Sequence, residues 1–371
     1  MVQSAEITNF RGFEVFEVTG LKLVNVIVGD NGVGKTAFLE ALHLAASGNG
    51  QRALALKQWR GSTAGYTTGV ASSVVEGVFN DLFHDPASNQ PIVITLTGKG
   101  VENRKLVIDK RRGDVIVPSA SAPGDNRHAR RAKQAQARRQ IVDVSGTIAA
   151  PISLTWTDHL GVEHGTRVLL RPQGMLEFEG TQEADLQSCH MFAAQAPTAP
   201  EEAASHYSAI QRRREIETFR RSFFSVFNEI TDVVVDQQGG AGTLLVDVPW
   251  AKELIPLPLF SGGTTRTAAV LLAIAFKRDG LLLLDEAESG IYHARQASYA
   301  KALIQLARDY QTQVVMTTHS DEWLRNFLSA VEEKDEDISF WRMERNKEGL
   351  SRLRPFTVKE FTSGLSMGEM R

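Results

Sequence analysis

The octapeptide GDNGVGKT at 29–36 constrains this chain more than any other feature of its sequence. It fits the pattern G-x-x-x-x-G-K-[ST], whose glycines let a loop bend so that several backbone N–H groups face one phosphate chain. Lys35 would neutralise the β and γ phosphates, and the Thr36 hydroxyl would complete the shell of a Mg²⁺ ion. We assign to the nucleotide the loop and the first helical turn after it: Asp30, Asn31, Gly32, Val33, Gly34, Lys35, Thr36 and Ala37.

A second part of such a site lies near residue 285. Leu281–Leu284 predicts a buried central strand, which we expect to lie beside the strand that precedes the phosphate loop. Asp285, at the carboxyl end of that strand, could reach Mg²⁺ directly or through water, and Glu286 could hold the attacking water as general base. Taken alone, the segment could equally be a strand that ends in surface acids. The phosphate loop in the same chain favours the catalytic interpretation.

Two shorter segments carry weaker signals. The tetrapeptide TTHS ends another apolar strand and contains His319, which could donate a hydrogen bond to a γ-phosphate. A single histidine is more often a packed or surface residue. The stretch LFSGGTTR places Ser261, Gly262 and Gly263 before an apolar run. Glycines that open a helix can expose backbone N–H groups to an anion, whereas a flexible turn is the alternative.

Length and composition set broad limits. With 371 residues the chain exceeds the size at which one core usually stops growing, so one bilobal domain or two domains is expected. The net charge of −3 predicts no general attraction to nucleic acid, although an average can conceal segregated charge. Cys189 is the single cysteine, which excludes an internal disulfide and favours a reducing compartment, the cytoplasm. No apolar run is long enough to span a bilayer, so we expect no membrane partner.

The alternation of strands and helices predicts how the chain is divided. Runs rich in β-formers before residue 190 predict an antiparallel meander, and strand alternating with helix after residue 240 predicts a parallel sheet. We therefore expect an α/β fold in a single bilobal domain, 1–371. Its predicted parts are a nucleotide-binding core at 1–50 and 240–320, an antiparallel β subdomain at 51–190, a helical lobe at 191–239 and a C-terminal tail at 321–371.

A basic insertion at 118–140 interrupts the predicted meander. Its first part has the composition of a loop, and its second part carries cations without one carboxylate. A mobile charged insertion or a solvated helix is one interpretation, and a contact with nucleic acid or an acidic partner is the other. The cations are Arg127, Arg130, Arg131, Lys133, Arg138 and Arg139.

Five segments occur in an order that is typical of one group of proteins: ITNFRGF, GDNGVGKT, SGG, LLLLDEAESGIYH and TTHS. This order resembles the ABC-type ATPase head of the RecF, SMC and OLD group. It is most similar to the stand-alone bacterial ATPases of that group, many of which belong to anti-phage defence systems. The similarity extends from Ile7 to about Ser320. It implies a P-loop NTPase of ABC/RecF-like type, with a mostly parallel core sheet, an antiparallel β subdomain, a helical lobe, and ATP and Mg²⁺ as cofactors.

The resemblance also implies roles for single residues. The SGG segment matches the signature motif, which binds the γ-phosphate of ATP held on a second copy of the chain. Asp285 and Glu286 match the Walker B pair, and His319 matches the switch histidine. Gln195 is placed where the family has a glutamine that senses Mg²⁺ and water. Arg11 sits where relatives approach the nucleotide.

Departures from the family narrow the predicted function. Phe260 and Thr264 stand where Leu and Gln are usual, which weakens the transporter branch. The gap between Thr36 and Ser261 is too short for a coiled-coil arm and hinge, so a full SMC protein is not expected. Relatives of the OLD type carry a nuclease domain after the ATPase, whereas about 50 residues follow His319 here. A nuclease would therefore be a separate chain.

The resemblance thus implies an ATP hydrolase that dimerises around ATP and switches a partner protein or DNA. Within that class we favour the ATPase component of a bacterial anti-phage defence system that works with a separate effector, a nuclease or a toxin. A RecF-like DNA repair ATPase is one alternative. A scaffold with slow turnover that sequesters a toxin or nuclease is another, and a transporter ATPase is a third.

Overall fold

The computed structural model describes residues 1–60, 79–99, 103–110, 149–158, 160–170, 176–180, 188–194, 196, 198–236 and 242–367. The basic insertion at 118–140 and Gln195 lie outside these residues. The interpretations of both therefore stay predictions.

The core of the fold is a six-stranded sheet in the order β16-β15-β3-β14-β13-β9. All neighbouring pairs are parallel except β15 with β16. Three of the strands are buried at every residue, as expected of a sheet covered on both faces. The strands are β3 (Val24–Val28), β9 (Cys189–Phe192), β13 (Leu281–Leu284), β14 (Gln313–Thr317), β15 (Ile338–Arg345) and β16 (Ser351–Phe356).

The strand order corrects one prediction. Leu281–Leu284 was expected beside the strand of the phosphate loop, but β14 lies between β13 and β3. An apolar run indicates burial on both faces but not which strand lies next to it, because the crossover connections decide that order. Because β14 is the middle strand, Thr317 at its end lies between the phosphate loop and Asp285.

A second sheet has seven antiparallel strands in the order β2-β1-β4-β5-β6-β7-β8. β4 and β5 alternate buried residues with half-buried or exposed ones, because one face of the sheet packs inward and the other faces solvent. The first two strands form a hairpin of this sheet, although residues 1–50 were assigned to the nucleotide-binding core. The strands are β1 (Ser4–Phe10), β2 (Phe13–Thr19), β4 (Ile92–Thr97), β5 (Arg104–Asp109), β6 (Ala149–Thr157), β7 (Glu163–Leu170) and β8 (Leu176–Gly180).

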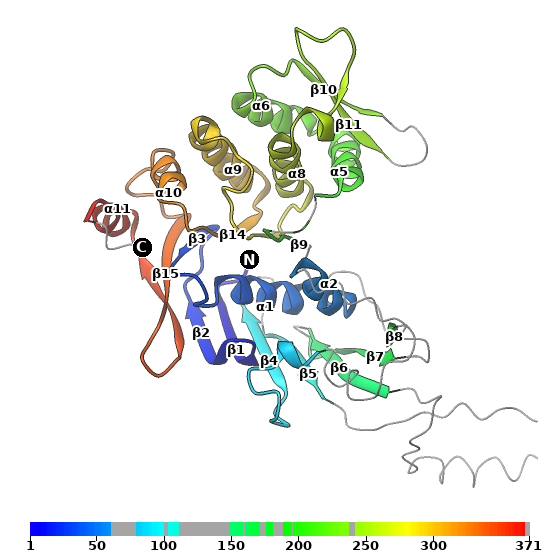
Figure 1. The fold of residues 1–371 in the computed structure, drawn as a ribbon, viewed down its shortest axis with the longest axis vertical. Helices are drawn as coiled ribbons and strands as arrows, with labels where there is room; N and C mark the ends of the chain where they lie inside the picture. The colour runs from blue at the N-terminus through cyan, green and yellow to red at the C-terminus, as the bar shows by residue number, and fades with distance from the viewer. Residues whose placement is uncertain are drawn as a thin grey trace, which may run out of the picture.

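Helix α1 (Lys35–Ser47) separates the two sheets (Figure 1). Every residue from Ala37 to Ser47 is buried, and the helix contacts strands of both sheets. A helix that is apolar around its whole circumference is stable only when it is covered on all sides. The phosphate loop that opens α1 is therefore fixed by two sheets, and α2 (Gln51–Trp59) follows along the same layer.

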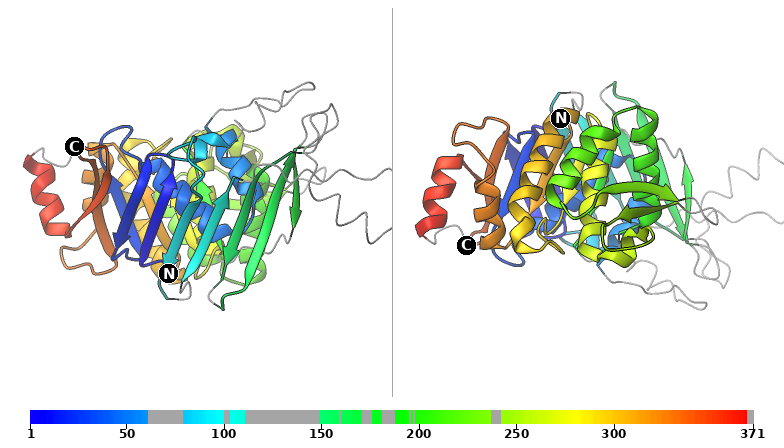
Figure 2. Two further views of the ribbon diagram at one scale, coloured as in Figure 1. Left: turned by 90° about the horizontal axis from the view of Figure 1, so that it is seen from below. Right: turned by 90° about the horizontal axis from the view of Figure 1, so that it is seen from above.

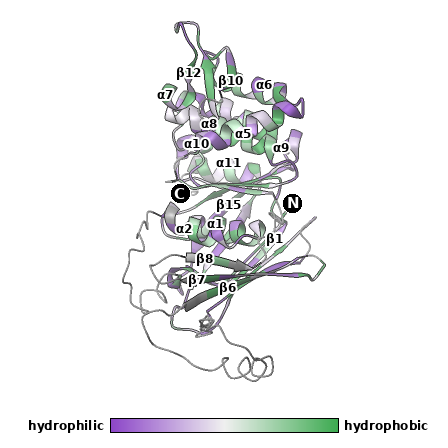
Figure 3. Ribbon diagram, turned by 90° about the vertical axis from the view of Figure 1, so that its right-hand side faces the viewer, coloured by the Kyte–Doolittle hydropathy of each residue, from purple (hydrophilic) through white to green (hydrophobic). Residues whose placement is uncertain are grey.

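The remaining helices cover the other face of the core sheet, so the molecule has four layers (Figure 3). Figure 2 shows the antiparallel sheet from one side and the helices from the other. The helices of this layer are α5 (Pro200–Arg212), α6 (Ile216–Val226), α7 (Leu257–Phe260), α8 (Gly262–Phe276), α9 (Gln296–Tyr310), α10 (Asp321–Leu328) and α11 (Val358–Met367). A small sheet lies beside them, made of β10 (Asp232–Asp236), β11 (Thr243–Asp247) and β12 (Ile255–Pro256).

The segment predicted as a C-terminal tail supplies two strands of the core sheet. β15 pairs with β3 along its length and returns as β16. Its first residues are buried, because they continue the parallel sheet under the helices. The predicted α/β class, with a mostly parallel core sheet, an antiparallel sheet and a helical lobe, is confirmed. None of the helices in the described part of the chain is long and apolar enough to cross a membrane.

Candidate active site

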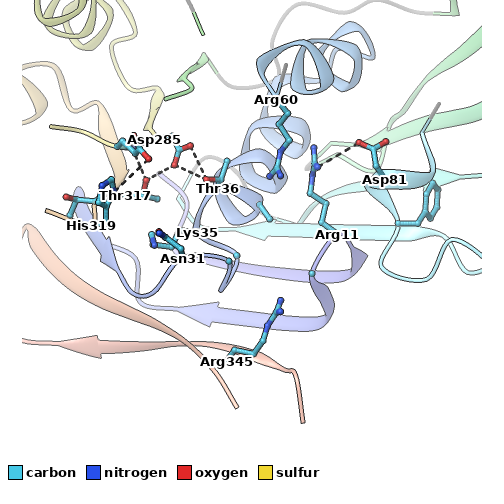
Figure 4. A pocket seen from close by; sticks show the side chains of 17 residues that line it. Arg11, Asn31, Lys35, Thr36, Arg60, Asp81, Asp285, Thr317, His319 and Arg345 are labelled. Carbon is cyan, nitrogen blue, oxygen red and sulfur yellow. Dashed lines mark hydrogen bonds and ion pairs between the residues drawn. The ribbon is translucent and has the colours of Figure 1, made fainter. Parts of the chain in front are cut away.

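A cavity of about 500 Å³ opens at the carboxyl ends of the central parallel strands (Figure 4). Ligands of open α/β sheets bind at this edge, because the loops that leave the strands converge there. The lining residues come from the phosphate loop and the start of α1, the ends of β13 and β14, the first hairpin, the end of α2, the segment 81–83 and β15. They are Arg11, Gly12, Asn31, Gly32, Gly34, Lys35, Thr36, Ala37, Arg60, Asp81, Phe83, Asp285, Glu286, Thr317, Thr318, His319 and Arg345.

The phosphate loop has the backbone that its glycines predict. Gly29, with φ 140, lies so close to β15 that an added Cβ would collide with the carbonyl oxygen of Met343. Gly34, with φ 115, caps α1 in a conformation that favours glycine. Lys35 Nζ donates to the carbonyl oxygens of Gly29 at 2.5 Å and Asp30 at 2.9 Å. Burial lowers the pKa of this amine, and its charge lies over the loop where a phosphate would bind.

Thr36 and Asp285 meet although 249 positions separate them. The Thr36 hydroxyl lies 3.1 and 3.0 Å from the two carboxylate oxygens of Asp285 and donates to them. Thr317 donates its hydroxyl to the same carboxylate at 2.7 Å. One hydroxyl and one carboxylate thus face the same point of the cavity, and a second hydroxyl, that of Thr317, fixes the orientation of the carboxylate.

Glu286 has a strained backbone conformation. Its φ is 51, in the left-handed region that a residue with a side chain seldom adopts, and its N–H donates to the Thr317 hydroxyl at 3.0 Å. Such conformations cost about 1–3 kcal/mol and are found where function requires them. The turn directs Glu286 off the end of β13 to the wall of the cavity, where its side chain is 45% exposed.

His319 lies at the same end of the cavity as Asp285 (Figure 4). Its Nδ1 is 3.8 Å from Glu286 Oε1 and 3.7 Å from Glu288 Oε1. Its backbone N–H donates to Glu288 Oε1 at 3.4 Å. The two carboxylates therefore lie beside one edge of the imidazole.

Some predicted nucleotide residues do not line the cavity. Asp30 and Val33 belong to the phosphate loop but contribute through their carbonyl oxygens, which accept from Lys35 and Ser351. The segment 261–263 lies elsewhere, at the start of α8, where the Ser261 hydroxyl accepts from the N–H of Thr264 at 3.4 Å. That it serves a nucleotide held on another copy stays a prediction.

The start of α8 packs on the segment that follows Glu286. An added Cβ at Gly263 would overlap the carbonyl oxygen of Gly290, whereas Gly262 has nothing within 4 Å of that position. We expect Gly263→Ala to lower the free energy of unfolding by about 1–3 kcal/mol, because backbone must move to relieve the overlap. Gly262→Ala is the matched control and should be neutral or slightly stabilising. Thermal unfolding of both variants measures the difference, and equal stabilities would contradict the close packing.

The second wall of the cavity contains Arg11, which the family resemblance placed near the nucleotide, and Arg60, which the sequence did not identify. Arg11 Nε forms an ion pair with Glu40 Oε2 at 2.8 Å, and Arg60 donates to both carboxylate oxygens of Glu40 at 2.8 and 2.9 Å. Glu40 is 1% exposed, and burial raises its pKa. Arg60 and Arg345 are single basic residues in unremarkable sequence, so only the fold reveals that both line the cavity.

Arg266 on α8 was also not identified from sequence. It donates to the carbonyl oxygens of Ala193 at 3.2 Å and Asp285 at 3.1 Å. One guanidinium therefore connects the end of β9, the end of β13 and the helix that begins with the SGG segment.

Two sequence comparisons identify relatives of the chain. Residues 24–325 match the model of the AAA_21 family, described as "AAA domain, putative AbiEii toxin, Type IV TA system". A protein of Helicobacter pylori (strain ATCC 700392 / 26695) named ATP/GTP phosphatase is 23% identical over 363 residues, which cover 90% of each protein.

Three solved structures of SMC heads align with the whole chain at low identity. An SMC head bound to the C-winged helix domain of ScpA gives a TM-score of 0.49 at 11% identity, over 97% of this chain and 99% of the other. The SMC head from Thermotoga maritima gives 0.41 at 14% identity, over 96% and 98%. An SMC head with an extended coiled coil, bound to the C-terminal domain of ScpA derived from Pyrococcus furiosus, gives 0.45 at 10%, over 99% and 98%.

Proposed function

The chain belongs to the AAA_21 family and is a P-loop ATPase, and we propose that it binds ATP in the described cavity and hydrolyses it as a dimer. The observation that carries the proposal is the convergence of Lys35, Asp285 and His319 on one cavity. The three residues follow three adjacent strands of the core sheet, and each was expected to contact ATP or its metal ion.

The proposed phosphate site is the N-terminal end of α1. The first N–H groups of a helix have no partner within the helix, and the helix dipole favours negative charge there. Lys35 adds a full positive charge to the same place. The ammonium group gives up two carbonyl contacts within the loop and takes phosphate oxygens in exchange, which is favourable because charge-assisted hydrogen bonds are the stronger ones.

The residues present fit a magnesium ion. Mg²⁺ prefers oxygen ligands and is bound through one or two protein oxygens together with substrate phosphates and water. The Thr36 hydroxyl and the Asp285 carboxylate, 3.0 Å apart, supply such oxygens at one point. Bound there, Mg²⁺ would neutralise charge on the β- and γ-phosphates. Gln195 stays a proposed additional ligand, because it lies outside the described residues.

Glu286 is the proposed general base. It would accept a proton from the attacking water as the water approaches the γ-phosphate. His319 would donate a hydrogen bond to the same phosphate, and the two nearby carboxylates hold its imidazole in position. Both side chains are about half exposed, so they are accessible to a nucleotide and to water.

A second copy of the chain is the proposed partner at the start of α8. The segment 261–263 opens a helix of 15 residues and stands apart from the cavity of its own chain. Leu259, just before the segment 261–263, and Tyr292, just after the Gly290 on which that segment packs, are 80% and 64% exposed. Large apolar side chains exposed beside a predicted anion site support burial of this face against another copy. ATP would add contacts only in the closed dimer and so shift the equilibrium toward it.

A separate effector protein is the proposed output of the switch. The family description names a toxin–antitoxin system, which supports a partner of the toxin or nuclease class and a role in bacterial defence. A gene for a nuclease or toxin beside the gene for this chain would support the pairing. DNA stays an alternative partner through the basic residues of 118–140, which lie outside the described residues.

The proposed function is tested with the purified chain. Phosphate release and sedimentation velocity are measured with ATP and Mg²⁺, with and without EDTA. We expect Mg²⁺-dependent phosphate release and an ATP-dependent shift from monomer to dimer. Lys35→Ala controls for contaminating ATPases and should remove both. Turnover by a chain that stays monomeric under the assay conditions would contradict the shared site.

A further inference from the structure

We propose that Arg345, at the end of β15, binds the α-phosphate of the nucleotide. The inference rests on the proposed ATP site and extends it to a part of the chain that sequence patterns left without a function. Arg345 lines the same cavity as Lys35 and Thr36 although more than 300 positions separate them.

The position of Arg345 in the cavity is the first argument. Its side chain rises from the β15–β16 hairpin toward the phosphate loop and faces the wall that carries Arg11 and Arg60 (Figure 4). The turn of the first hairpin makes room for it: an added Cβ at Gly12 would lie 2.9 Å from Arg345 Nη2. A ligand that occupies the cavity therefore has cations on both sides.

The second argument is that Arg345, unlike the other two arginines, has no ion-pair partner in the described part of the chain. Arg11 and Arg60 both form ion pairs with the carboxylate of Glu40, and Arg11 Nη1 also lies 3.9 Å from Asp81 Oδ2. Arg345 has no carboxylate partner among the described residues, although its guanidinium can donate to two oxygens at once. An uncompensated guanidinium in the wall of a phosphate site is suited to bidentate binding of a phosphate.

The rigidity of the hairpin is the third argument. Ser351, the register partner of Arg345, donates its hydroxyl to the carbonyl oxygen of Val33 at 2.8 Å, and that bond is buried. Met343 packs its backbone against Gly29, where the phosphate loop begins. The hairpin thus contacts the loop at two places, so Arg345 is held close to its binding position before a ligand binds.

The place of Arg345 along the cavity identifies the phosphate. Asp285, Glu286 and His319 mark the end at which the γ-phosphate would be cleaved. Arg345 lies instead beside Gly12 and the first hairpin, away from those residues. The phosphate nearest that side is the one attached to the nucleoside, which ATP and ADP share. Loss of the contact should therefore lower the affinities for ATP and for ADP equally.

The test is the affinity of Arg345→Gln for ATP and for ADP, measured by calorimetry with Mg²⁺. We expect both affinities to fall about tenfold, because a hydrogen bond to a charged group contributes on this scale. Arg345→Lys should recover part of the loss. Arg352→Gln is the matched control, since it removes the same charge from the same hairpin at an exposed position outside the cavity, and it should bind like the wild type.

Three outcomes would overturn the inference, and they differ from failure of the proposed function. Affinities of Arg345→Gln equal to those of the wild type would show that Arg345 does not bind the nucleotide. A loss of affinity for ATP alone would indicate a contact with the γ-phosphate instead. An equal loss of affinity in Arg352→Gln would indicate a general effect of charge. A wild-type chain that binds no ATP would instead refute the proposed ATP site itself.

Discussion

Replacing Glu286 by glutamine is expected to lower ATP turnover by about 10²–10⁴-fold while the affinity for ATP changes little. The amide keeps the size and the hydrogen-bonding reach of the side chain but cannot accept the proton of the attacking water. Lys35, Thr36 and Asp285 are unaffected, so the phosphates and the metal ion would still be held. Steady-state phosphate release and calorimetric ATP binding measure the two quantities separately.

Glu288 provides a matched control for this experiment. Its Oε1 is as close to His319 as that of Glu286, but Glu288 is 12% exposed and does not line the cavity. Glu288→Gln should therefore retain most of the turnover, with a smaller loss through the position of His319. Slow turnover in the wild type that Glu286→Gln leaves unchanged would contradict the hydrolytic switch and favour the scaffold alternative.

The site residues that could be predicted from sequence are those whose role depends on residues close to them in the chain. A phosphate loop needs its glycines, lysine and threonine within eight consecutive positions, so the pattern at 29–36 predicts both the backbone and the chemistry. Asp285 and His319 follow apolar strands, and carboxyl ends of parallel strands meet at one edge of a sheet. The structure brings these residues to one cavity for that reason.

The residues that sequence could not predict depend on connections between distant segments. The order of β3, β14 and β13 is decided by crossovers, and so is the bond between Thr317 and Asp285. Arg60 and Arg345 have no motif around them, and their place in the cavity follows from α2 and from the return of the chain into the core sheet. The strain at Glu286 likewise depends on the turn that follows β13.

The division of the chain into parts was predicted in outline only. Residues 1–19 were grouped with the core because they precede the phosphate loop, yet their alternation of apolar and polar residues is that of a sheet with one solvent face. β15 was not assigned to the core because its apolar run is short and lies beyond the last motif. In both cases the apolar pattern correctly indicated which residues are buried. The position of a strand in the sequence did not indicate which sheet it joins.

Replacing Ser261 by arginine is expected to abolish ATP-dependent dimerisation and to lower turnover by about 10²-fold or more, while ATP binding by the monomer stays intact. Ser261 lies outside the cavity, so the change leaves the phosphate loop untouched. It places a long side chain where the N-terminus of α8 would meet the γ-phosphate of the partner copy. Sedimentation velocity with ATP, phosphate release and calorimetry measure the three effects.

Ser261→Ala distinguishes steric blocking by the arginine side chain from loss of the hydrogen bond that caps α8. Both variants remove the hydroxyl that accepts the N–H of Thr264, but only arginine fills the space in front of the helix. The alanine variant should keep ATP-dependent dimerisation with a modest loss of stability, about 0.5–2 kcal/mol. If Ser261→Arg dimerises and hydrolyses ATP like the wild type, the segment 261–263 is only the start of a packed helix, and the shared site must be abandoned. If only the arginine variant fails, a second copy of the chain completes the site.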